Sequence, residues 1–97
     1  MTAERAHAYR RVMRTLNELG ASKLLAAEQD LIRHAADSLV FSRNLLEDGT
    51  AHEALENIER LCRALVDSGR WEHATAMRLA DDVSDCGPAL LPWLKAA

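Results

Sequence analysis

The segment from Ala26 to Ser42 has the pattern of an apolar helix, but four polar residues interrupt it: Glu28, His34, Ser38 and Ser42. At 3.6 residues per turn, three of the four fall within the apolar arc of that helix, and His34 lies near its edge. A carboxylate, an imidazole and two hydroxyls that converge in a bundle core would bind a small polar ligand or perform acid–base chemistry. These four residues are therefore the candidate ligand-binding residues.

Helix geometry limits what these residues do together. Glu28 and His34 point about 120° apart and lie about 9 Å apart along one helix axis, so they do not form a dyad there. The structural alternative gives Ser38 and Ser42 the role of allowing a neighbouring helix to approach closely and of bonding back to the preceding turn. Glu28 would then pair with an arginine of the first helix or of another subunit. The sequence leaves both interpretations open.

Two other groups of residues have the types that metal sites use. Glu4 and His7 have the Glu-x-x-His spacing of di-iron bundles, which need two such motifs and two further glutamates. His52, Glu56 and Glu59 share one face of a predicted helix, but pairing with arginines four residues further on explains the glutamates. We therefore expect surface roles for these residues, no metal and no cofactor.

Two cysteines, Cys62 and Cys86, match neither a disulfide framework nor a metal-binding spacing. Cys62 falls on an apolar helix face and is expected to be a small buried residue. Cys86 lies near a predicted chain reversal, where it would be exposed and reactive, but the sequence supplies no base to make it a nucleophile. We therefore predict neither an intrachain disulfide nor a catalytic residue, and the chain is not expected to be an enzyme.

A small basic patch is predicted on the first helix: Arg10, Arg11 and Arg14, with Arg5 nearby. Few phosphates would be contacted, and no aromatic residue is interleaved to stack on bases. The formal net charge is −3. Nucleic acid is therefore not expected as a partner, and a weak nucleic-acid-associated regulator remains only an alternative.

The elements that would position these residues are helices. The chain has 97 residues, enough for one domain spanning 1–97, and is 48% hydrophobic, 28% charged and 4% aromatic. Alanine, leucine, glutamate and arginine favour helices, and strand-like alternation does not occur. No apolar run approaches the roughly 20 residues that span a bilayer, and no secretory signal begins the sequence, so we expect a cytoplasmic protein without membrane contact.

Start and stop signals divide the chain into four helices. The first is predicted to begin after Thr2 and to end near Leu19, with Gly20 in the left-handed conformation. The second is predicted to run from Ser22 as N-cap to about Glu47, which makes it the longest. The remaining signals are a Thr50–Glu53 capping box, Gly69 closing the third helix, a fourth helix beginning between Arg70 and His73, and Gly87, in a reversed conformation, and Pro88 ending it. The fold class is all-α, an antiparallel up-and-down four-helix bundle with a long second helix and an apolar C-terminal tail.

The long second helix has more apolar surface than three short neighbours are expected to cover. We therefore expect a homodimer built on this helix and on the apolar tail that follows Pro88. Its interface would include Leu31, Leu39, Phe41, Leu45, Leu91 and Trp93. The predicted function is that of a small non-enzymatic interaction or adaptor protein acting through homo-oligomerisation and binding of another protein. A helical carrier of a small ligand or metal is the alternative.

Overall fold

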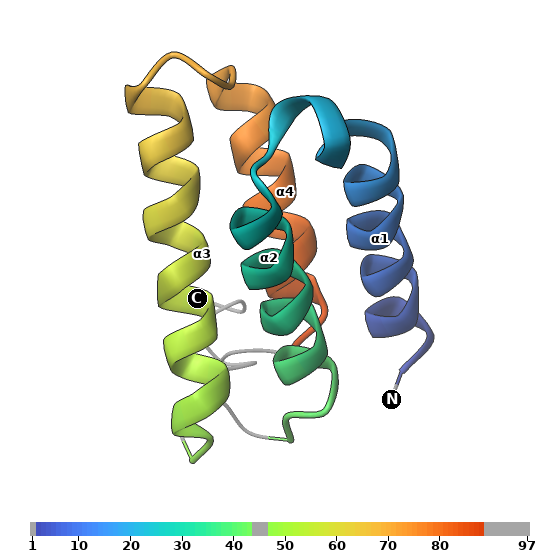
Figure 1. Cartoon of the computed structure of the whole chain (residues 1–97). Coiled ribbons are helices and arrows are strands. Elements are labelled where there is room, and N and C mark those ends of the chain that lie inside the picture. The colour runs from blue at the N-terminus through green and yellow to red at the C-terminus, as the bar shows by residue number, and fades with distance from the viewer. Residues whose placement is uncertain (1, 44–46, 89–97) are drawn as a thin grey trace.

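The computed structural model describes residues 2–43 and 47–88, and these residues form an all-α bundle, as predicted. Within these two ranges the chain forms four helices: α1 (Ala3–Lys23), α2 (Ala26–Val40), α3 (Gly49–Asp67) and α4 (His73–Asp85). In Figure 1, α1 and α3 run upward and α2 and α4 run downward.

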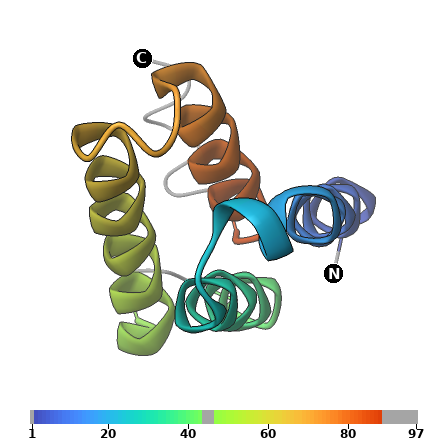
Figure 2. The same cartoon turned by 45° about the horizontal axis from the view of Figure 1, so that its top comes forward.

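The four helices are arranged so that α2 and α4 lie between α1 and α3 (Figure 2). Each of these two central helices packs against all three of the others. The core between them is built from small and branched side chains. Its largest fully buried members are Ile32, Leu39, Ile58, Leu65, Leu79, Val12, Val83 and Cys86.

The boundary between the first two helices lies later in the sequence than predicted. Thr2 caps α1 as expected, because its Oγ1 accepts a hydrogen bond from the Arg5 backbone N–H at 3.2 Å. However, α1 does not end near Leu19; it continues to Lys23 and includes Ser22, the predicted cap of the next helix. Gly20 therefore lies inside α1. A glycine inside a helix lowers its stability by only about 1 kcal/mol relative to alanine, and the packing of α1 against α2 and α4 outweighs this cost.

The prediction of a long second helix is wrong. α2 has 15 residues, fewer than the 21 of α1 and the 19 of α3. It ends at Val40 because the Arg5 side chain takes its terminal carbonyl oxygens. Arg5 Nη2 donates to the carbonyls of Leu39 at 2.7 Å, Val40 at 3.0 Å and Ser42 at 2.7 Å. The last carbonyls of a helix lack the i+4 amide partners of the helix interior, so a guanidinium that donates to them stabilises this end.

The ends of α3 and α4 differ from the prediction in two details. Asp48, not Thr50, caps α3, and its carboxylate accepts from the Ala51 backbone N–H at 3.0 Å. Gly69 has the predicted left-handed conformation, with a φ of 76°, whereas Gly87 does not have a positive φ. A Cβ at Gly87 would lie 3.0 Å from Leu39 Cδ2, so a side chain at this position would press on the core.

Most of the apolar surface of α2 is covered by its own chain. Its buried residues are Ile32, Ala35, Ala36, Leu39 and Val40. Leu25, just before the helix, is 65% exposed and Phe41, just after it, is 81% exposed. The expected excess of apolar surface along α2 is therefore confined to its two ends. Among the residues that the structure describes, no helix combines the length and the hydropathy needed to span a bilayer.

Candidate functional site

The polar residues predicted on α2 do not form a site together. Glu28 forms a bidentate ion pair with Arg70 of the α3–α4 loop, with Nη2–Oε1 and Nη1–Oε2 distances of 2.7 and 2.8 Å. Its Oε1 also accepts from the Leu25 backbone N–H at 2.8 Å. The Arg70 guanidinium, followed by the Leu25 amide, lowers the pKa of Glu28. Glu28 therefore joins the start of α2 to a distant loop, and its arginine comes from neither of the two sources that were expected.

The other three candidates lie in different surroundings. His34 is exposed and Ser38 is half-buried on α2. Ser42 lies beyond the end of α2, and its backbone N–H donates to the Leu39 carbonyl at 3.1 Å. The buried Ser42 hydroxyl has no hydrogen-bond partner. Neither of the two hollows described below is lined by any of these residues.

The predicted interface residues are distributed between the core and the surface. Leu39 is fully buried inside its own chain, so its assignment to an interface is wrong. Leu31 is half-buried and packs against the core, and Phe41 is exposed. The predictions for Leu45, Leu91 and Trp93 lie outside the described residues, as does that for the apolar tail as a whole.

The basic patch on α1 is smaller than predicted because one of its arginines is neutralised. Arg11 Nε lies 2.9 Å from Asp82 Oδ1, and Arg11 Nη2 lies 3.7 Å from Asp85 Oδ2. Asp82 is buried, so Arg11 supplies the counter-charge that a buried carboxylate requires. Arg10 and Arg14 are exposed.

An open groove with a volume of about 540 Å³ lies between α3 and α4. Helical spacing produces its two walls, because residues three and four apart lie on one helix face. The α3 wall is formed by Leu55, Glu59, Cys62, Arg63, Val66 and Asp67. The α4 wall is formed by His73, Ala76, Met77, Ala80, Asp81 and Ser84.

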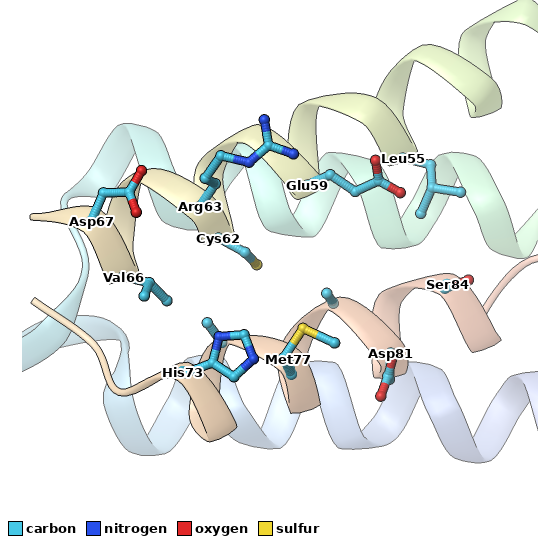
Figure 3. Close-up of a pocket in the computed structure, with 12 residues that line it drawn as sticks. Leu55, Glu59, Cys62, Arg63, Val66, Asp67, His73, Met77, Asp81 and Ser84 are labelled. Atoms are coloured by element: carbon cyan, nitrogen blue, oxygen red, sulfur yellow. The ribbon is translucent and has the colours of Figure 1, made fainter.

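The floor of this groove is apolar and its edges are charged. Figure 3 shows Cys62 and Val66 pointing from α3 towards α4, and Met77 extending from α4 into the space between them. The side chains of Arg63 and Asp67 point away from α4. Met77 is 47% exposed, one of the few large apolar side chains of the described chain that is open to solvent. The groove can therefore bury apolar side chains of another segment while its rim stays in water.

The charge of the groove rim is negative. The rim carries the exposed carboxylates of Glu59, Asp67 and Asp81 and one guanidinium, that of Arg63. Burial, with a smaller contribution from the charge of Glu59, raises the pKa of the Cys62 thiol. A thiol that stays protonated is a poor nucleophile and a poor metal ligand. The described residues contain no cluster of three histidine, cysteine or carboxylate side chains placed to hold a metal.

Cys86, expected to be exposed near a chain reversal, is instead buried. Both cysteines are free and buried. Burial, together with the charge of Asp82, raises the pKa of the Cys86 thiol to about 11. Its Sγ donates to the Asp82 carbonyl at 3.3 Å, so it serves the packing of α4.

A second, smaller hollow of about 340 Å³ lies between α1 and α2. Tyr9 crosses it, and its hydroxyl donates to Asp37 Oδ1 at 2.7 Å. This hydrogen bond, with burial and the negative charge of Asp37, raises the pKa of Tyr9. The exposed ring of Phe41 forms part of its wall. The hydrogen bond between Tyr9 and Asp37 already uses the principal polar groups of this hollow. We therefore regard the hollow as part of the packing between α1 and α2.

The groove could not be predicted from the sequence, because the helical spacing of its α3 wall is also that of a buried helix face. Leu55, Cys62 and Val66 have the spacing of core residues, and Cys62 is indeed buried. The available signal was Met77, a large apolar residue of the fourth helix that lies beside the inward-facing stripe and not within it.

Comparison with known proteins gives no independent assignment: no protein-family model, curated protein or solved structure matches this chain.

Proposed function

We propose that this protein acts by binding another polypeptide in the α3–α4 groove. The observation that carries the proposal is the groove itself, whose apolar floor leaves Met77 half-exposed beneath a charged rim. Grooves between two helices bind amphipathic segments whose apolar residues recur three and four positions apart. The negative rim favours a docking segment that is apolar on one side and basic beside it.

Met77 is the residue with which to test this proposal. Full burial of a methionine side chain contributes about 1.5–3 kcal/mol, and Met77 already has about half of its surface covered. Replacing Met77 by asparagine should therefore weaken binding by about 1 kcal/mol, roughly five- to tenfold in Kd. Ala74→Asn is the matched control, since Ala74 is exposed on the same helix and does not line the groove.

The experiment begins with a photo-crosslinking amino acid placed at position 77 in the source cells, and at position 74 in a parallel strain. A protein that is cross-linked from position 77 and not from position 74 is then purified and titrated against the wild-type chain and both asparagine variants. The proposal requires weaker binding by Met77→Asn alone. Equal cross-linking from both positions, or a Kd that Met77→Asn leaves unchanged, contradicts it.

A homodimer is a second proposal, supported by narrower observations than the sequence implied. Phe41 is 81% exposed and Leu25 is 65% exposed, at opposite ends of α2. A second copy that covers Phe41 would make the sedimentation coefficient rise with protein concentration, and Phe41→Ser would remove that rise. A wild-type chain that sediments as a monomer at high micromolar concentration rules this proposal out. We expect a cytoplasmic location for either interaction, an expectation that rests on the amino-acid sequence alone.

A further inference from the structure

The described chain ends close to the α3–α4 groove. α4 ends at Asp85, and the described chain continues to Pro88. Figure 3 shows Ser84 and Leu55 at the same end of the groove. Pro88, the last described residue before this segment, therefore follows closely after the Ser84 end of the groove.

The nine residues that follow Pro88 are long enough to reach along the whole groove. The α4 wall runs from Ser84 back to His73, which is about 17 Å at 1.5 Å per residue. Nine residues reach up to about 30 Å when extended, at 3.3–3.6 Å each. Even after a reversal of direction beyond Pro88, enough chain remains to pass Met77.

The chemistry of residues 89–97 matches that of the groove. Their sequence is ALLPWLKAA, in which four of nine residues are large and apolar: Leu90, Leu91, Trp93 and Leu94. The only charged side chain is that of Lys95, which is positive. Three of the four charged aspartate, glutamate and arginine side chains on the rim are negative. An apolar segment with one cation therefore complements an apolar floor with an acidic edge.

We infer that residues 89–97 dock in the α3–α4 groove of their own chain, with Trp93 beside Met77. The inference rests on the proposed role of the groove as a docking surface, and it names the first occupant of that surface. A partner polypeptide must displace this segment, so the segment lowers the affinity for the partner. Trp93→Ser is expected to increase partner affinity severalfold, because the competing segment loses its largest apolar side chain.

The full-length chain offers a direct test, because it contains two tryptophans, Trp71 and Trp93. Biosynthetic labelling with 5-fluorotryptophan gives two fluorine resonances, and a Trp93→Phe variant assigns them. Trp71 is the internal reference, since it is buried and its indole N–H donates to the Lys23 carbonyl at 3.2 Å. A water-soluble gadolinium chelate broadens the resonance of each ring according to its exposure to solvent.

The inference predicts that the Trp93 resonance is protected severalfold compared with the urea-unfolded chain, at low and high protein concentration alike. Met77→Asn should remove that protection and Ala74→Asn should preserve it, while an unchanged Trp71 resonance shows that each variant is folded. Three results would overturn the inference: an exposed Trp93 in the wild-type chain, protection that survives Met77→Asn, or protection that appears only as the concentration rises. The third result would place the segment in the groove of a second copy.

The two proposals can fail separately. If Trp93 is exposed while Met77→Asn still weakens partner binding, the segment is not the occupant and the groove remains a binding surface. If Trp93 is protected while Met77→Asn leaves the Kd for the partner unchanged, the groove binds only its own chain and the proposed function is wrong.

Discussion

Arg5 joins the ends of three helices, and its replacement by lysine is the sharpest test of how this fold is held together. In addition to the carbonyls at the end of α2, Arg5 Nε donates to the Cys86 carbonyl beyond α4 at 2.8 Å. A lysine keeps the positive charge, but its single ammonium reaches only one of these two helix ends. The substitution therefore removes the fork geometry and leaves the charge in place.

The magnitude follows from the bonds that are lost. A hydrogen bond to a charged group contributes about 1.5–3 kcal/mol. Arg5 is half-buried, so water replaces part of each lost bond and the lower end of this range applies. Losing at least the single bond to the Cys86 carbonyl should therefore lower the free energy of unfolding by about 1.5 kcal/mol or more, which corresponds to a fall in Tm of roughly 6–12 °C for a domain of this size.

The assay is urea unfolding followed by circular dichroism, with Arg14→Lys as the control on the exposed face of the same helix. The control should lie within about 0.5 kcal/mol of the wild-type chain. If Arg5→Lys is as stable as Arg14→Lys, the guanidinium does not hold the end of α2, and our explanation for the short second helix fails.

Three further predictions concern single contacts. Glu28 has a lowered pKa, so its bond to Arg70 stabilises the fold above the ordinary glutamate value of 4.5, and this contribution disappears as the pH falls through the lowered pKa. Arg70→Gln should therefore destabilise the chain in urea at neutral pH, and its effect should shrink as the pH falls through that lowered pKa. Tyr9 is the only tyrosine, and Asp37→Ala should move its phenolate absorbance titration to lower pH, towards the ordinary value of 10.0; an unmoved titration would contradict the hydrogen bond. Gly87→Ala should lower the free energy of unfolding by about 1 kcal/mol, because the new methyl group lies 3.0 Å from a buried leucine; a gain in stability would show that the leucine moves aside.

The sequence was sufficient to predict the fold class because it depends on local pattern. Helix-forming composition and apolar residues at helical spacing recur through the chain, and the structure confirms an all-α bundle in the ranges that it describes. The start of α1 and the end of α3, which depend on neighbouring residues, were also predicted correctly. Thr2 caps one helix and Gly69, with its positive φ, closes another.

The two boundaries of α2 were predicted wrongly because they depend on residues far away in the sequence. α2 ends at Val40 because of Arg5, which lies 35 positions earlier. Its start is fixed by Glu28 with Arg70, 42 positions later. Periodicity within a window of a dozen residues contains no information about either contact, so the apolar pattern through Phe41 was read as one long helix.

The candidate site was missed for a different reason, which also indicates where this protein can bind. The side-chain hydrogen bonds and ion pairs described above that join two helices all have one end on α1, through Arg5, Tyr9 and Arg11. The α3–α4 contact is instead made by apolar side chains such as Cys62 and Met77, which tolerate many neighbours because dispersion contacts are not directional. Polar contacts with fixed geometry therefore specify the fold on the α1 side, and the adaptable apolar wall of the α3–α4 groove is the surface on which we propose binding. The sequence pattern shows which helix faces are apolar. Only the packing of the helices shows which of these apolar faces is left open to solvent.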